Sequence, residues 1–127
     1  MSCVQTINTI CKHVEASDTY YVDLEPLLGT SETVSSVTSV TPVDTTLTAA
    51  SPAVLSSQTT VTNYSRDLDG NTTTTTYVIA ANKGISFTLS GGATGAGCSV
   101  ITVIFVKSSG KTDAVDCLIE IEGVDVA

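Results

Sequence analysis

The chain has 127 residues, of which 42% are hydrophobic, and its formal net charge at pH 7 is −8. This length allows one domain with a hydrophobic core and an additional arm, and no apolar run approaches the ~18–20 residues of a membrane-spanning helix. Only five residues are Lys or Arg, so the composition excludes the basic surface that binding to nucleic acid or to an anionic membrane requires.

The first 18 residues, Met1–Asp18, are interpreted as an N-terminal arm. Their apolar residues have a loose helical spacing, but the segment has no evident cap and contains several Thr and Ile residues. We expect an extended arm with at most one short helix, which packs either on its own domain or on a neighbouring subunit. Residues 19–127 are expected to form one domain. No basic region followed by an apolar one begins the chain, so no signal peptide is predicted.

Two strands are predicted between residues 19 and 41. Thr19–Leu24 is rich in aromatic and β-branched residues. Glu32–Thr41 carries Val34, Val37 and Val40 at a spacing of three, which fits the period of neither a helix nor a strand. Because Ser and Thr fill the positions between the valines, we expect a strand with an irregularity such as a β-bulge.

Short strands and polar turns are predicted in the middle of the chain. Asp44–Thr48 and Ala53–Thr62 have the composition of strands, and a turn at Ala49–Pro52 separates them. Asn63–Asn71 is the most polar loop. The threonine run after it leads into aromatic and β-branched residues, so Thr72–Ile79 is predicted to be a strand rather than a linker.

Gly84–Ser90 has the clearest alternation of apolar and polar residues in the chain. Ile85, Phe87 and Leu89 are predicted to face the core, and the hydroxyl residues between them face solvent. The glycines from Gly91 to Gly97 then form a flexible connection. They are not a phosphate-binding loop, because no Gly-Lys-Ser/Thr ends the glycine segment and the next element is a strand.

The segment Cys98–Gly123 predicts a β-hairpin with its turn at Ser109 and Gly110. A turn centred on these two residues pairs Lys107 with Thr112. The facing sets are then Val115, Cys117, Ile119 and Ile121 on the last strand and Ile104, Thr102, Val100 and Cys98 on the first. The remaining apolar residues of the first strand, which include Val103 and Phe105, are expected to form an outer face that meets core or a partner subunit.

These strands predict an all-β fold, an immunoglobulin-like β-sandwich of seven to eight short antiparallel strands, because turn signals recur every ~8–12 residues. Of the four cysteines, Cys98 and Cys117 are expected to be free core thiols, since the expected register separates them too far for a disulfide. Whether Cys3 and Cys11 are free or paired with each other is left open.

Asp67, Asp69 and Asn71 have the alternate spacing of calcium ligands, but they also suit a polar turn between strands. An EF-hand loop needs Gly at its sixth position and Glu at its twelfth, whereas here Gly70 is fourth and Val78 is twelfth. A turn explains the same residues, so no calcium site is assigned.

Cys11, His13 and Glu15 lie close together in the sequence, as zinc ligands or a nucleophile with its base would. Zinc sites use about four ligands with paired spacings, and the chain has no CxxC. We interpret His13 as a surface residue. Asn63 and Asn71 begin glycosylation sequons, which carry no meaning without a secretory signal. No catalytic, cofactor-binding or metal-binding residue and no cofactor is therefore assigned, and we expect a structural protein rather than an enzyme.

Two stretches carry a resemblance to known proteins. They are LLGTSETVSSVTSV, from Leu27, and ISFTLSGGATGAGCSVITVIFVKSSGKTDAVDCLIEIEG, from Ile85. They resemble small immunoglobulin-like virion proteins of tailed bacteriophages, in which an L-G-x-D-T-I-like segment precedes a variable middle and a glycine-rich block with T-S-x-G-R-T-D closes the domain. The matching residues of the closing block are Leu89, Ser90, Gly91, Gly92, Gly95, Ser108, Gly110, Lys111, Thr112 and Asp113. The arm has no counterpart, and Val100 and Ile101 stand where the family has an aromatic residue.

The resemblance implies a virion component without enzymatic activity. We expect a capsid decoration or cement protein, made in the host cytoplasm, that binds the major capsid protein on the outer capsid surface and stabilises the head. Self-association, as in a trimer, is expected through Val103 and Phe105. The alternative is a tail, neck or fibre-associated module of the same fold. Attachment to a host glycan is less favoured, because Tyr64 is the only aromatic residue in a polar loop.

Overall fold

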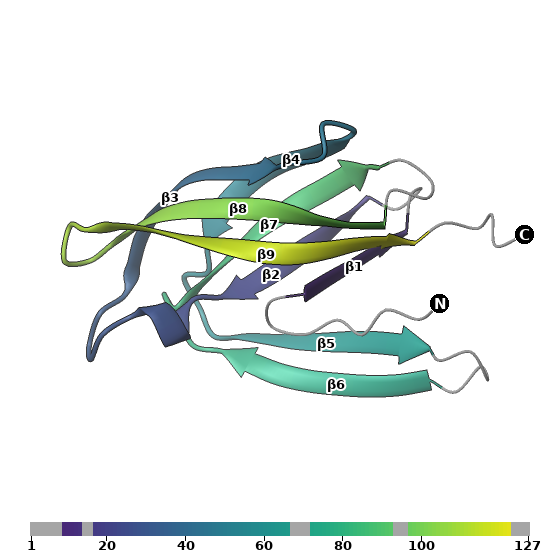
Figure 1. The fold of residues 1–127 in the computed structure, drawn as a ribbon. Helices are drawn as coiled ribbons and strands as arrows, with labels where there is room; N and C mark the ends of the chain where they lie inside the picture. Colours follow the sequence, from purple (N-terminus) through teal and green to yellow (C-terminus); the bar gives the residue numbers. More distant parts are fainter. Residues whose placement is uncertain (1–8, 14–16, 67–71, 93–96, 123–127) are drawn as a thin grey trace, which may run out of the picture.

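The computed structural model describes residues 9–13, 17–66, 72–92 and 97–122, which form nine strands and one short 3-10 turn, η1 (Glu25–Leu27) (Figure 1). The strands are β1 (Thr9–His13), β2 (Asp18–Asp23), β3 (Val34–Pro42), β4 (Leu47–Val54), β5 (Thr59–Arg66), β6 (Thr72–Ile79), β7 (Gly84–Gly91), β8 (Gly97–Lys107) and β9 (Thr112–Glu122). The prediction of an all-β fold is confirmed. The predicted number of seven to eight strands is too low for the described residues.

The strands form three sheets. A four-stranded sheet has the order β1-β9-β8-β3, a three-stranded sheet has the order β2-β7-β4, and β5 and β6 pair only with each other. One hydrophobic core is enclosed by residues of both larger sheets, an arrangement consistent with a β-sandwich. All pairs are antiparallel except β1 with β9, so the prediction of purely antiparallel strands is wrong at this edge.

Part of the predicted N-terminal arm lies on its own domain. β1 pairs in parallel with β9, from Thr9 opposite Leu118 to His13 opposite Glu122. Of the two interpretations of the arm, packing on the same chain therefore holds for these five residues. The role of the rest of Met1–Asp18 stays a prediction.

β7 is the central strand of the three-stranded sheet and confirms its predicted alternation. Ile85, Phe87 and Leu89 are fully buried, whereas Ser86 and Thr88 between them are half-buried. Each such apolar side chain contributes about 1.5–3 kcal/mol by leaving water. Since β7 pairs with β2 on one side and β4 on the other, these three residues anchor the whole sheet to the core.

β3 explains the unusual spacing of its valines. Its register against β8 shifts twice, between Val34 and Ser36 and again between Val37 and Ser39. Each shift adds one residue to β3, so that two residues instead of one separate successive core positions. Val34 is buried and Val37 and Val40 pack against the core. The predicted irregularity is therefore confirmed, and it is what turns a spacing of three into one core-facing side.

The predicted turn at Ala49–Pro52 is wrong. β4 runs continuously through this segment, and its register against β7 shifts between Ala50 and Ala53. Ser51 has a φ of 54°, so the irregularity that Ser-Pro imposes is absorbed inside the strand. Pro52 is tolerated because β4 lies at the edge of its sheet, where a missing N–H costs no ladder hydrogen bond. The next strand accordingly begins at Thr59, later than expected.

The C-terminal hairpin is confirmed, but its predicted register is wrong by one residue. Thr112 pairs with Val106 and not with Lys107. The Gly110 N–H donates to the Lys107 carbonyl at 2.8 Å, and the Lys107 N–H donates to the Lys111 carbonyl at 2.8 Å. The loop thus has three residues and ends on Gly110 at a φ of 89°, the pattern of a turn followed by a glycine bulge.

This one-residue difference exchanges the two faces of β8. Val103 and Phe105 are fully buried in the core, as is Ile101. The expectation that Val103 and Phe105 form a self-association surface is therefore wrong. Cys117 lies opposite Ile101 as a buried free thiol, which confirms one of the two predicted core thiols, and burial raises its pKa to about 11. The side chain of Cys98 lies outside the described residues.

Candidate interaction surface

The outer face of the β8–β9 hairpin presents apolar side chains to solvent. Two apolar cross-strand pairs, Val100 with Leu118 and Ile104 with Ala114, lie on either side of one polar pair. In that polar pair the Thr102 hydroxyl donates to the Asp116 carboxylate at 2.8 Å. Side chains directly opposite each other in an antiparallel ladder are in contact. The face is thus a continuous surface of alternating apolar and polar pairs.

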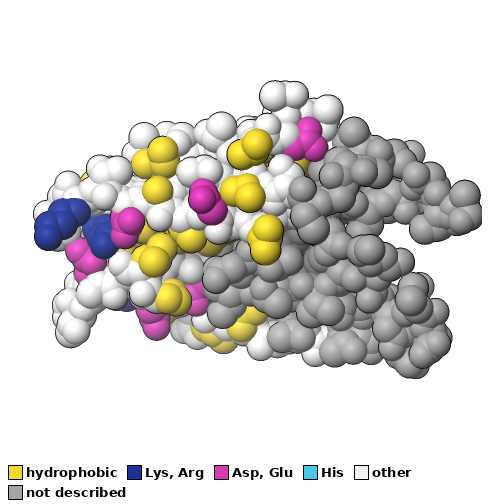
Figure 2. Space-filling model, in the orientation of Figure 1, with side chains coloured by type: hydrophobic (Ala, Val, Ile, Leu, Met, Phe, Trp, Pro, Cys, Tyr) yellow, Lys and Arg dark blue, Asp and Glu magenta, His cyan; other side chains and the backbone are white. Residues whose placement is uncertain are grey.

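This surface, which we call the outer face, comprises Val100, Thr102, Ile104, Val106, Ala114, Asp116 and Leu118. Leu118 is 52% exposed, and Val100, Ile104 and Val106 are half-buried. Figure 2 shows hydrophobic side chains in separate patches over β8 and β9, with an acidic side chain among them. On β3, the neighbours of Val106 and Ile104 are Ser36 and Ser39. The outer face can therefore bind another surface through apolar contact and hydroxyl groups.

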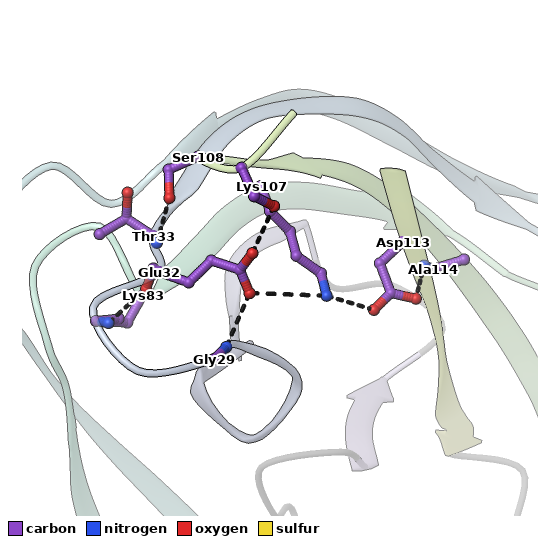
Figure 3. A network of polar contacts seen from close by, with 9 residues as sticks. Gly29, Glu32, Thr33, Lys83, Lys107, Ser108, Asp113 and Ala114 are labelled. Carbon is purple, nitrogen blue, oxygen red and sulfur yellow. Dashed lines mark hydrogen bonds and ion pairs between the residues drawn. The ribbon is translucent and has the colours of Figure 1, made fainter. Parts of the chain in front are cut away.

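A network of polar contacts, which we call the hairpin clamp, fastens the loop before β3 to the turn of the hairpin (Figure 3). The Glu32 carboxylate accepts hydrogen bonds from the Gly29 N–H at 2.8 Å and from the Ser109 hydroxyl at 2.6 Å. Next to it, the Ser108 N–H donates to the Thr33 carbonyl at 2.8 Å, and the Thr33 N–H donates to the Ser108 hydroxyl at 3.0 Å. Two segments about 75 residues apart in the sequence are thereby held together.

Two lysines complete the hairpin clamp. The Lys107 ammonium group lies 3.2 Å from the Asp113 carboxylate and 3.8 Å from that of Glu32. The Lys83 ammonium group donates to the Glu32 carbonyl at 2.5 Å and so attaches the turn before β7 to the same loop. The hairpin clamp therefore fixes the relative positions of three connections at one end of the molecule.

The hydrogen bonds of the hairpin clamp favour the charged forms of its acids. The Gly29 N–H first, and then the Ser109 hydroxyl and Lys107, lower the pKa of Glu32. The Ala114 N–H first, and then Lys107, lower the pKa of Asp113. Both carboxylates are thus anionic acceptors at neutral pH, with their hydrogen-bonding capacity directed to structural donors rather than to a substrate.

A hollow of about 300 Å³ adjoins the hairpin clamp and is open to solvent. It is lined by Gly29, Thr30, Ser31, Glu32, Ser108 and Ser109. Apart from Glu32, which is engaged in the clamp, its side chains offer only hydroxyl groups. Ser31 has a φ of 63°, so the tight loop that forms the rim places one non-glycine residue in the left-handed region.

The other residues weighed in the sequence lie mostly outside the described part of the chain. Asp67, Asp69 and Asn71 are among the residues that are not described, and so is Glu15. His13 and Cys11 belong to β1, but their side chains are not described. Among the residues that are described, no three His, Cys, Asp or Glu side chains gather as metal ligands, and no helix there has the length and apolarity to cross a membrane.

The loop glycines and Tyr64 have different positions from those expected. Gly91 ends β7, and the Gly92 N–H donates to the Thr46 carbonyl at 3.0 Å, so the start of the predicted flexible connection is held by the chain. Tyr64 and Asn63 lie in β5 and not in a loop. The hairpin clamp was missed in the sequence, which marks its two segments only through the resemblance and does not indicate that they meet.

Comparison with protein-family models, with curated proteins and with solved structures finds no match to this chain.

Proposed function

We propose that this chain is a non-enzymatic virion protein of a tailed bacteriophage, a capsid decoration protein that binds the major capsid protein on the outer surface of the head. The observation that carries this proposal is the hairpin clamp. It joins the two stretches on which the family resemblance rests, the Leu-Gly-x-x-Glu-Thr-Val segment around Glu32 and the Lys-Ser-Ser-Gly-Lys-Thr-Asp segment from Lys107 to Asp113. Because the two motifs form one structural unit, their joint presence supports common ancestry with that family better than two isolated turns would.

The strand order supports an immunoglobulin-like fold for the domain. In that fold, one sheet contains strands B, E and D and the other contains C, F and G. The three-stranded sheet β2-β7-β4 and the strands β3, β8 and β9 have these orders. β1, beside β9, corresponds to an additional edge strand, and the β5–β6 hairpin to an insertion between D and E. The small virion proteins that the sequence resembles are also immunoglobulin-like.

The outer face supports a role in binding a protein surface. It lies on one broad side of the molecule, and each of its two apolar pairs joins one exposed residue, Leu118 or Ala114, to a half-buried one. A contact of about 800 Å² per partner is typical of a specific interface. Many copies, each bridging neighbouring capsid subunits, would add their binding energies by avidity and stabilise the head against internal pressure.

The test begins with purified virions of the phage that encodes the chain. The decoration proposal predicts many copies per particle, in a fixed ratio to the major capsid protein, and saturable rebinding of purified protein to heads that lack it. Quantitative mass spectrometry and co-sedimentation measure these two quantities. A few copies per particle, or binding to tails alone, would instead favour a tail, neck or fibre module, and absence from the virion would overturn both.

The role of the N-terminal arm is tested in the same assay with two deletions. Removal of residues 1–8 leaves β1 in place, whereas removal of Met1–Asp18 also removes a strand that pairs with β9. If the arm reaches a neighbouring subunit, the shorter deletion weakens binding to heads while thermal stability is unchanged. Binding that is lost only with the longer deletion would mean that the arm acts through β1 and the fold.

A further inference from the structure

β5 and β6 form a ribbon that is separate from both larger sheets. Their register is continuous over eight pairs, from Thr59 opposite Ile79 to Arg66 opposite Thr72. Val61 and Ile79 are buried at the base of the ribbon, whereas Thr60, Thr62, Thr74 and Thr76 are exposed. Figure 1 shows β6 as the outermost strand on this side of the molecule. A two-stranded ribbon alone is only marginally stable in water.

The edges of the two larger sheets carry features that discourage pairing with another chain. Exposed edges are commonly protected by bulges, Pro, charges or shortness. β3 has two register shifts and ends at Pro42, and β4 contains Pro52 next to its own shift. β2 begins at Asp18 and ends at Asp23, and β1 is five residues long. Each of these four edges thus has at least one protecting device.

The outer edge of β6 has none of these devices. The strand Thr72–Ile79 contains no charged residue and no Pro or Gly, and its pairing with β5 has no register shift. All eight of its residues are β-branched or aromatic, the types that favour extended structure. Among the described strands, only β5 pairs with β6. The contrast with the other edges indicates that this edge is open for pairing.

We propose that the outer edge of β6 pairs with β6 of a second copy of this chain, in antiparallel orientation, and joins the two ribbons into one four-stranded sheet. A chain of net charge −8 repels its own copies at most surfaces, but two β6 strands bring no charged residue to their seam. Antiparallel pairing of identical strands also closes a twofold dimer and leaves no further β6 edge open. A second copy is therefore the partner that this edge fits.

The side chains at such a seam are mutually compatible. In a pairing centred on Thr74, Thr72 of one copy lies opposite Thr76 of the other, and the two Thr74 residues lie opposite each other. Cross-strand threonine pairs are favourable, each contributing roughly 0.2–1 kcal/mol, and like charges placed opposite each other are unfavourable. Lysines on the exposed face of β6 should therefore weaken the dimer.

The experiment is sedimentation equilibrium on the purified full-length chain. The variant Thr74→Lys/Thr76→Lys places two lysines on the exposed face of β6, and the matched control Thr60→Lys/Thr62→Lys places two on the same face of β5, one strand away from the seam. We expect a dimer whose Kd rises at least ~10-fold in the β6 variant, equivalent to about 1.4 kcal/mol, and changes little in the control. A chain that stays monomeric, or equal weakening by both pairs, overturns the proposal.

A measurement on the unmodified chain keeps the proposal testable if the β6 variant does not fold. Hydrogen–deuterium exchange at low and high protein concentration should show added protection of amides within residues 72–76 with dimerisation. The amides at the edges β2 and β4 should not change. Protection that appears at another edge would place the dimer contact elsewhere and overturn the assignment to β6. Neither measurement depends on whether the chain belongs to a virion.

Discussion

At the scale of single residues, Glu32 determines how firmly the loop before β3 is attached to the hairpin. One oxygen of its carboxylate accepts the Gly29 N–H, and the other accepts the Ser109 hydroxyl. A side chain at this position that accepts neither hydrogen bond leaves two structural donors without their partner. Hydrogen bonds to a charged acceptor are stronger than neutral ones. Loss of the charge and loss of the acceptor should therefore have separable effects on stability.

We predict that Glu32→Ala lowers the Tm by roughly 3–6 °C and Glu32→Gln by about half as much. The first change removes both hydrogen bonds and the ion pair with Lys107, whereas the second removes the charge but keeps one acceptor oxygen and an amide NH2 that can donate to the Ser109 hydroxyl. Glu25→Gln is the control, because Glu25 is an exposed acid on η1. Thermal unfolding followed by circular dichroism at pH 7 measures the differences. Equal Tm values for all four proteins would show that the hairpin clamp contributes nothing to stability.

The Tm difference between wild type and the Glu32 variants should also depend on pH, in a direction that the pKa of Glu32 determines. The pKa of Glu32 in the folded chain lies below its ordinary value of 4.5. A lowered pKa contributes stability that is present above the ordinary value and is lost as the pH falls through the folded value. The Tm difference between wild type and Glu32→Gln should therefore be complete at pH 6 and shrink in acid below pH 4.5. A difference that stays constant down to pH 3 would contradict the role of the charge.

At the scale of elements, the turn of the β8–β9 hairpin sets which residues are buried. Gly110 has a φ of 89°, and a Cβ at this position would meet no atom within 4 Å. The need for glycine is therefore conformational and not steric. We predict that Gly110→Ala destabilises the fold by about 1–2 kcal/mol and Gly110→Asn by less, because Asn tolerates the left-handed region better. Denaturant unfolding measures both.

The control for this prediction is Gly29→Ala. Gly29 does not have a left-handed φ, and the nearest atom to its Cβ would be at the ordinary distance of 3.6 Å. At such a site alanine is neutral or stabilises by up to ~1 kcal/mol, since it restricts the unfolded chain. If Gly110→Ala were as mild as Gly29→Ala, the glycine bulge would not be what fixes the register of β8 and β9.

The elements also show how far the sequence alone predicts this fold. Strand positions such as β7 could be predicted, because the alternation of Ile85, Phe87 and Leu89 is a local signal. The register of the hairpin could not, because a three-residue loop Ser-Ser-Gly and a four-residue loop Ser-Ser-Gly-Lys both suit this sequence. The structure has the three-residue loop, with Gly110 at a φ of 89°. That choice reversed the predicted faces of β8. The parallel pairing of β1 depends on contacts with β9, a hundred residues away, and has no local signal.

The two candidate surfaces could likewise not be located without the strand register and the long-range contacts. The outer face could be located only once the register assigned Val103 and Phe105 to the core and left Val100 and Ile104 outside. The hairpin clamp needs Glu32 and Ser109 to meet across 77 positions of sequence, which no periodicity encodes. The sequence resemblance rests on both segments but gives no reason for them to meet. In the structure, hydrogen bonds and an ion pair join them.

At the scale of the whole molecule, two exposed leucines differ in their position relative to the outer face. Leu118 on the outer face is 52% exposed and lies opposite the half-buried Val100. Leu27, on η1 between β2 and β3 in the chain, is 37% exposed and is not part of this face. Both leucines can be changed at the surface without removing a core side chain, so they form a matched pair for testing the proposed capsid contact.

We predict that Leu118→Lys weakens binding to heads at least ~10-fold, because a charge would be placed in the apolar part of an interface and would lose ~1.4 kcal/mol or more there. Leu27→Lys should bind as wild type does. Neither change should alter the free energy of unfolding by more than ~0.5 kcal/mol, since both side chains are exposed. Co-sedimentation with heads that lack the protein measures binding, and denaturant unfolding provides the control for folding. If both variants bind equally well to heads, the outer face is not the capsid contact, while the decoration proposal itself would still be judged by copy number.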